Sequence, residues 1–120
     1  MSHYVFELPY PPSINGYWRT VRINGKNRTL ISKRGREYRA DVIQAIGKGI
    51  PALNARIKVE IRAFMPDKRR RDIDNILKSL NDSLTHAGVW NDDEQIDDLR
   101  IIRSGIESPG KVIVTVSQII

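Results

Sequence analysis

The sequence feature that most constrains the fold is a clean alternation of polar and apolar residues from Arg56 to Ala63, within the segment from Arg56 to Met65 (RIKVEIRAFM). Successive side chains of a β-strand point to opposite faces, so a period of two predicts a strand with one buried face. Pro66 ends this strand, because proline lacks the backbone N–H that a sheet ladder requires. The residues that follow Pro66 therefore lie at the end of this strand.

Those residues carry an unusual distribution of charge. Four consecutive basic residues, Lys68 to Arg71, stand directly before Asp72 and Asp74. A helical pattern of apolar residues then runs from about Asp74 to Ala87, and an acidic cluster surrounds Asp92 and Asp93. Positive charge suited to a polyanion thus lies beside carboxylates suited to a divalent cation, which is typical of a metal-dependent nuclease.

The remaining elements follow from shorter signals. His3 to Leu8 alternates like a strand and is followed by three prolines, so Ser13 to Arg19 is expected to be a loop. Asn24-Gly25 predicts a hairpin turn between two short strands, 21–23 and 28–31. Ser32 is suited to cap a helix from about Lys33 to Gly47.

Two further strands are predicted near the end of the chain, from Ile96 to Arg103 and from Lys111 to Ser117. The turn signal Ser108-Pro109-Gly110 lies between them, so we expect an antiparallel hairpin. Together the elements predict an α+β fold, in which two helices pack on a small mixed sheet of about four to five strands.

Two features near the N-terminus allow more than one interpretation. Tyr17 and Trp18 either pack beneath their loop or stack on an unpaired base, with Arg19 on a phosphate. The hairpin that follows is part of a stretch with eight basic residues and one acid from Arg19 to Arg39. It is either a solvated edge or a finger that lies along a nucleic acid groove.

Composition narrows the class of protein. The 120 residues suit a single domain over residues 1–120, and the absence of cysteine excludes disulfides and thiolate metal sites. The net charge is +6, and residues 1–60 carry eleven lysines and arginines against four acids, so a phosphate backbone is the expected partner. No signal peptide or membrane-spanning run is recognisable, and we expect a soluble cytoplasmic protein without a membrane or small-molecule partner.

The spacing of the acids sets a geometric condition. Residues two apart share a face in an extended chain but diverge in a helix, so Asp72 must be extended if it and Asp74 share one metal. Asp93 becomes a third ligand if its loop folds back, and Lys78 adds positive charge near the reacting phosphate. In the alternative interpretation, Asp72 is only a helix cap, and Asp74 and Lys78 form an ordinary surface ion pair. The cluster around Asp92 and Asp93 is then only a solvated acidic loop, and Arg69 to Arg71 neutralise these acids within the protein.

Several motifs in order resemble one family. Pro66 to Asn75 (PDKRRRDIDN) with Lys78, followed by Gly88 to Gln95 (GVWNDDEQ), looks like the RusA family of Holliday-junction resolvases. Leu8 to Ser13 (LPYPPS) with Asn15, and Ser32 to Arg39 (SKRGREYR), are similar to that family as well. The resemblance covers nearly the whole sequence.

This resemblance implies a RusA-like fold and a homodimeric endonuclease, dependent on Mg²⁺ or Mn²⁺ and often prophage-encoded. Such an enzyme resolves four-way DNA junctions by paired nicks in recombination and repair. By motif position, Asp72, Asp74 and Asp93 are the catalytic metal ligands and Lys78 the catalytic lysine. Two alternatives remain: a nuclease of the same fold that cuts other branched DNA, and a non-catalytic DNA-binding protein. The residues expected to contact DNA are Asn15, Tyr17, Arg19, Arg36, Lys68, Arg69, Arg70 and Arg71.

Overall fold

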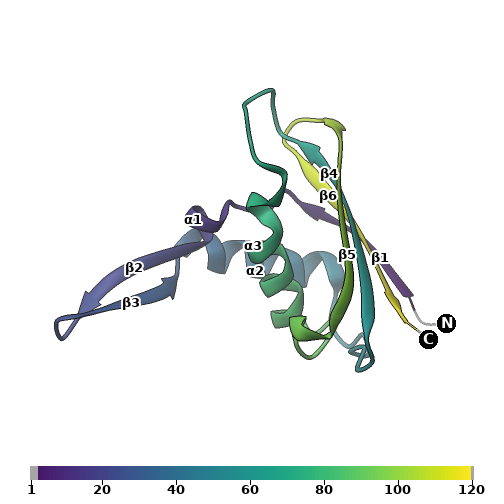
Figure 1. Ribbon diagram of the computed structural model, residues 1–120, viewed down its shortest axis with the longest axis horizontal. Coiled ribbons are helices and arrows are strands. Elements are labelled where there is room, and N and C mark those ends of the chain that lie inside the picture. Colours follow the sequence, from purple (N-terminus) through teal and green to yellow (C-terminus); the bar gives the residue numbers. More distant parts are fainter. Residues whose placement is uncertain (1–2, 120) are drawn as a thin grey trace.

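The computed structural model describes residues 3–119, so residues 1, 2 and 120 of the predicted domain lie outside the described part. A four-stranded mixed sheet has the order β1-β6-β4-β5, and a separate hairpin pairs β2 with β3 (Figure 1). This confirms the predicted α+β fold. The elements are β1 (His3–Pro9), α1 (Ile14–Tyr17), β2 (Trp18–Ile23), β3 (Lys26–Ile31), α2 (Lys33–Ile46), β4 (Ile57–Met65), η1 (Ile73–Ile76), α3 (Leu77–His86), η2 (Asp93–Gln95), β5 (Ile96–Ile106) and β6 (Lys111–Gln118).

Strand β4 is a central strand of the sheet and confirms the alternation that predicted it. Its apolar residues Ile57, Val59, Ile61 and Ala63 are fully buried, whereas Lys58 and the other intervening residues are partly or fully exposed. It pairs antiparallel with β6 on one side and parallel with β5 on the other. A parallel pair requires a long crossover, and α3 supplies it between β4 and β5.

The predicted antiparallel hairpin of the last two strands is wrong. The turn at residues 108–110 is present, but β4 lies between β5 and β6, so these two strands do not pair with each other. Their connection passes the end of β4, where the Glu107 N–H donates to the Met65 carbonyl at 2.9 Å. Turn residues show only that the chain reverses; the strongly apolar face of β4 decides which strand occupies the interior of the sheet.

Helices α2 and α3 lie on one side of the sheet, while the opposite face is open (Figure 1). Tyr38 and Val42 of α2, together with Leu80 and Leu84 of α3, belong to the same buried core as β4 and β6. Burial of each large apolar side chain contributes about 1.5–3 kcal/mol, which holds both helices firmly against the sheet. No helix within residues 3–119 is long and apolar enough to cross a membrane.

The predicted helix cap at Ser32 and the predicted hairpin turn are confirmed. The Ser32 hydroxyl accepts a hydrogen bond from the Gly35 N–H at 2.9 Å, at the start of α2. Asn24 and Gly25 both have positive φ angles, of 51° and 75°, as the tight turn between β2 and β3 requires. This hairpin projects away from the sheet and from both long helices (Figure 1).

The predicted loop from Ser13 to Arg19 is instead a short helix, α1, followed by the start of β2. Ser13 caps this helix by accepting from the Gly16 N–H at 3.2 Å. Helix α1 lies tightly against α2, since a Cβ at Gly35 would be 2.6 Å from the Tyr17 carbonyl oxygen. Only glycine allows this approach, which places α1 and the base of the hairpin beside α3.

Candidate active site

The loop of residues 66–72, here called the basic loop, leaves the sheet at the end of β4 and is held by its own side chains. The Arg71 guanidinium donates to both carboxylate oxygens of Asp67, at 2.6 and 3.1 Å. This hydrogen bond, together with one from the Arg69 N–H, lowers the pKa of Asp67 from 3.8 to about 2. Arg103 of β5 donates to the Arg71 carbonyl at 2.7 Å and ties the loop to the sheet.

The four basic residues of this loop therefore differ in their availability to DNA. Lys68, Arg69 and Arg70 are exposed. Arg69 makes only a long ion pair, with its Nε 3.8 Å from a carboxylate oxygen of Asp67. Arg71 is engaged in the bidentate ion pair and its side chain is 21% exposed. The alternative interpretation, in which arginines neutralise nearby acid, thus applies to Arg71, and its partner is Asp67 within the loop.

Asp72 and Asp74 sit where the basic loop becomes helical. Asp72 has extended angles, with φ −74° and ψ 135°, and η1 begins at the next residue. The geometric condition for a shared metal is therefore met at Asp72. The predicted helix from about Asp74 to Ala87 consists of η1 followed by α3, so its first turn is a 3₁₀ turn. Asp72 occupies the N-cap position without capping through its side chain.

Lys78, in the first turn of α3, joins the helix to the acidic cluster. Its ammonium nitrogen lies 3.9 Å from a carboxylate oxygen of Asp93, the first residue of η2. The Asp93 loop thus folds back to Lys78, and its approach to Asp72 and Asp74 stays a prediction. Within residues 3–119, Lys78 pairs with Asp93 and not with Asp74. This excludes the alternative in which Asp74 and Lys78 form a surface ion pair.

The three predicted metal ligands are only partly brought together. Among the residues that the structure describes, no three acidic or histidine side chains form a group that could hold one metal ion. Asp72 and Asp74 are exposed carboxylates with no hydrogen bond to the described chain, so both are open to an external ligand. Mg²⁺ usually takes one or two carboxylates and completes its shell with water and phosphate oxygens, so this donor chemistry fits a hard divalent ion.

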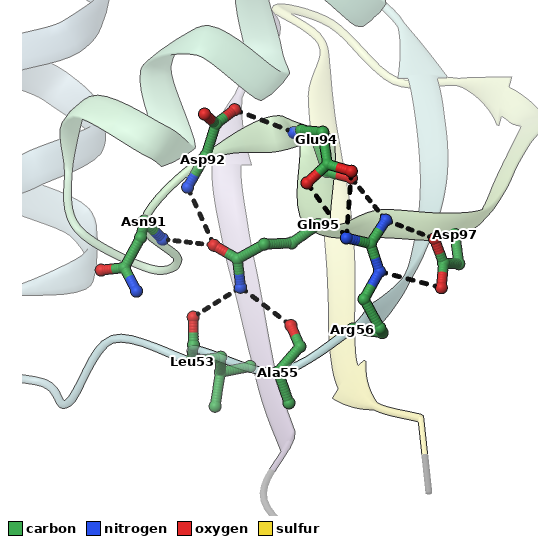
Figure 2. Close-up of polar contacts among 8 residues, drawn as sticks. All are labelled: Leu53, Ala55, Arg56, Asn91, Asp92, Glu94, Gln95 and Asp97. Carbon is green, nitrogen blue, oxygen red and sulfur yellow. Dashed lines mark hydrogen bonds and ion pairs between the residues drawn. The ribbon is translucent and has the colours of Figure 1, made fainter.

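Residues 91–97, here called the acidic segment, are held far more tightly (Figure 2). Asp92 caps η2 by accepting from the Glu94 N–H at 3.0 Å. The Arg56 guanidinium donates to the carboxylates of Glu94 and Asp97, at 3.0 and 2.5 Å. Hydrogen bonding to Arg56 also lowers the pKa of Asp97. The acidic segment is therefore not merely solvated, because three of its acids have structural partners and Asp93 alone faces Lys78.

A groove with a volume of about 900 Å³ lies beside Lys78. Asn15 of α1, Arg19 of β2 and Lys78 of α3 line it together with the half-buried Trp18. The structure thus brings two of the predicted DNA-binding residues next to the predicted catalytic lysine, although Lys78 is far from both in the sequence. Trp18 is the aromatic side chain that remains available to a base at this groove.

Tyr17 does not have this role, and its assignment as a DNA contact is corrected. Its side chain is fully buried, and its hydroxyl donates to Asp82 at 2.5 Å while accepting from the Arg39 guanidinium at 2.8 Å. Burial alone would raise the pKa of Asp82, but hydrogen bonds from Tyr17 and Arg39 outweigh it and lower that pKa. A ring enclosed in this cluster cannot stack on a base; it joins α1 and α2 to α3 beneath the groove.

Arg36 lies away from the other site residues. Its guanidinium donates to the Ile31 carbonyl at 3.1 Å, and it lines a separate hollow with Arg39 and His86. Arg34, one half-turn earlier on α2, instead lines a hollow of about 210 Å³ with Asp72. Sequence reasoning missed Arg34 because helical spacing alone does not show which face of α2 meets the basic loop.

Comparisons with known proteins agree with these motifs. The family model described as "Endodeoxyribonuclease RusA" matches residues 9–117. A crossover junction endodeoxyribonuclease of Enterobacteria phage HK97 is 49% identical over 112 residues, covering 92% of this chain and 89% of the relative. Crossover junction endodeoxyribonucleases RusA of Shigella sonnei and Escherichia coli K12 are 38% and 37% identical over 120 residues, covering 98% of this chain and 97% of each relative. The chain therefore belongs to the RusA family of endodeoxyribonucleases.

Proposed function

We propose that the protein is a structure-selective endonuclease that resolves four-way DNA junctions by paired, metal-dependent nicks. The observation that carries this proposal is the contact between Asp93 and Lys78 at the wall of a groove lined by Asn15 and Arg19. A pure DNA-binding protein gains nothing from carboxylates beside a polyanion. Membership of a family of endodeoxyribonucleases supports the catalytic interpretation.

Each polar group of the site has a distinct role in this proposal. Asp72, Asp74 and Asp93 would hold Mg²⁺, or Mn²⁺ in its place, through their carboxylate oxygens. A bound divalent ion supplies a nucleophilic hydroxide from water and stabilises the oxygens of an in-line displacement. Lys78 places its ammonium group where the pentacoordinate phosphate gathers negative charge, and Asp93 orients that group from 3.9 Å.

The exposed cations bind the DNA backbone. Lys68, Arg69 and Arg70 lie on the basic loop beside Asp72, and Arg19 lines the same groove as Lys78. Guanidinium groups suit this purpose because they donate two parallel hydrogen bonds to a phosphate. The basic hairpin β2–β3 extends this positive surface away from the site, as a finger along the DNA.

A homodimer is the assembly that suits such a substrate. A four-way junction offers two equivalent strands for cleavage, and a two-fold enzyme presents one active site to each. Two chains of charge +6 also create a strong attractive field for the phosphates. Action on chromosomal or prophage DNA places the enzyme in the cytoplasm.

The test is cleavage of a synthetic four-way junction with Mg²⁺ or Mn²⁺, comparing wild type with Asp72→Asn. We expect Asp72→Asn to lower the cleavage rate by about 100-fold or more, because metal catalysis supplies several kcal/mol. Junction binding should persist, because the phosphate contacts remain. The matched control is Asp98→Asn, which removes an exposed carboxylate of β5 and should cleave like wild type.

Equal cleavage by wild type and Asp72→Asn would contradict the active-site assignment. Flap and linear duplexes tested side by side decide substrate selectivity: preference for a flap would replace the junction with another branched DNA. Binding without cleavage at any metal concentration would leave only a non-catalytic DNA-binding protein.

A further inference from the structure

Gln95 is buried at the end of η2, and its amide group joins two distant parts of the chain (Figure 2). Its side-chain nitrogen donates to the Leu53 and Ala55 carbonyls, at 2.9 and 2.8 Å. Its side-chain oxygen accepts from the Asn91 and Asp92 N–H groups, at 2.8 and 2.9 Å. All four partners are backbone groups, so the amide determines the path of the main chain on both sides.

Only an amide side chain can make this set of bonds. Glutamine offers two N–H donors and an oxygen with two lone pairs on one planar group. A carboxylate of the same shape accepts but cannot donate, so it would leave the Leu53 and Ala55 carbonyls without partners. Gln95 is 8% exposed, and an unpaired polar group at such a site is costly.

Asp93 lies between the residues that this amide anchors. Asp92 before it is fixed by its N–H bond to Gln95 and by its own cap on η2, and Gln95 follows two residues later. Arg56 reinforces the segment from outside by donating to the Glu94 carbonyl at 2.6 Å and to the carboxylates of Glu94 and Asp97. The Asp93 carboxylate itself takes no part in this clamp and faces Lys78 at 3.9 Å.

We propose that Gln95, reinforced by Arg56, is a positioning residue for Asp93 in the cleavage reaction. The inference rests on the proposed function, in which Asp93 acts with Lys78. A three-residue 3₁₀ turn has few internal hydrogen bonds, so its geometry depends on anchors to the rest of the fold. Gln95 supplies those anchors and keeps the Asp93 carboxylate beside the Lys78 ammonium group.

The test compares Gln95→Met and Arg56→Met with wild type. Four quantities are measured: the turnover of a four-way junction, its Kd in EDTA, the affinity for Mn²⁺ by calorimetry without DNA, and the melting temperature. We expect Gln95→Met to weaken turnover or Mn²⁺ affinity by about 10–100-fold, as is usual for groups that orient metal ligands. Arg56→Met should shift both in the same direction by less, and the junction Kd should stay within about twofold, since neither residue lines the groove.

Tyr38→Phe is the matched control for a merely structural loss. It removes one partly buried hydrogen bond, from the Tyr38 hydroxyl of α2 to the Pro9 carbonyl at 2.7 Å, and involves neither a predicted metal ligand nor a member of the clamp. It should lower the melting temperature without changing Mn²⁺ affinity. Arg56→Met removes an exposed side chain and keeps the test decisive if Gln95→Met does not fold.

The inference is overturned if both Met variants lose melting temperature as Tyr38→Phe does while turnover and Mn²⁺ affinity stay at wild-type values. Wild type that cleaves no junction would instead overturn the proposed function, and the Mn²⁺ titration would still test the clamp on Asp93. Wild type that binds no Mn²⁺ would overturn both.

Discussion

The basic loop and the acidic segment both bring carboxylates to the site, but they are held in different ways. The basic loop is held mainly by Asp67, which accepts from the Arg71 guanidinium and the Arg69 N–H, and by one bond from Arg103 to its backbone. The acidic segment is fixed by a buried amide with four backbone partners and by the Arg56 guanidinium. One region is exposed and locally folded, whereas the other is anchored in the core.

This difference suggests how the site divides its work. In the proposed function, Asp93 and Lys78 already lie 3.9 Å apart without DNA, so their relative position is set in advance. Asp72 and the exposed cations Lys68, Arg69 and Arg70 lie on the basic loop and would adapt to phosphates and a metal. A branched DNA that varies in shape is better bound by a site with one adaptable region than by a site with two rigid regions.

The largest expected effect is the difference in cleavage rate between a variant of Asp93 and a variant of its neighbour Asp92. Asp93→Asn should lower junction cleavage by about 100-fold or more, because it removes the carboxylate opposite Lys78. Asp92→Asn should stay within a few-fold of wild type, since asparagine caps a helix as well as aspartate does. Single-turnover cleavage at saturating protein measures both. Similar losses in the two variants would show that the segment acts only through its net charge.

A smaller effect should separate two arginines of the basic loop. Arg70 is exposed and has no ion pair within residues 3–119, whereas Arg71 is held by Asp67. Arg70→Gln should reduce the slope of log K against log salt for junction binding by about 1, as expected for the loss of one phosphate contact. Arg71→Gln should change that slope by less.

Junction affinity measured over a series of salt concentrations tests this difference. The Asp98→Asn variant, remote from the loop, serves as the reference and should bind slightly more tightly through its lost negative charge. An equal change of slope in the two arginine variants would mean that Arg71 leaves Asp67 to bind DNA.

The smallest effect concerns the pKa of Asp67. The hydrogen bond from Arg71 holds this pKa at about 2, and Arg71→Gln should return it toward 3.8. A lowered pKa means that this pair stabilises the fold above the unfolded value of about 3.9, and that the contribution fades as pH falls toward 2. An NMR titration of the Asp67 carboxyl carbon measures the change. An unshifted Asp67 pKa in the wild type would show that the hydrogen bonds from Arg71 to Asp67 do not persist in solution.

Much of the local structure could be predicted from the sequence. The alternation from Arg56 to Ala63, the cap at Ser32 and the turn at Asn24-Gly25 depend on short-range geometry, and the structure confirms all three. An extended Asp72 was a condition for a shared metal that the local signals allowed, and the structure meets this condition. The spacing of Asp92 and Gln95 matches a capping box and could have identified Gln95 as well.

Other features depend on contacts between residues far apart in the chain. No turn signal could show that β4 separates β5 from β6, since strand order is decided by which apolar face is buried most completely. The burial of Tyr17 requires Asp82 and Arg39, which lie 65 and 22 residues away. The residue types, the hydrophobic periods and the helix caps of the sequence thus predicted the helices and strands and identified the carboxylates near the site. Only the tertiary structure shows how Asp93 is presented, because Lys78 and the carbonyls that anchor Gln95 come from other parts of the chain.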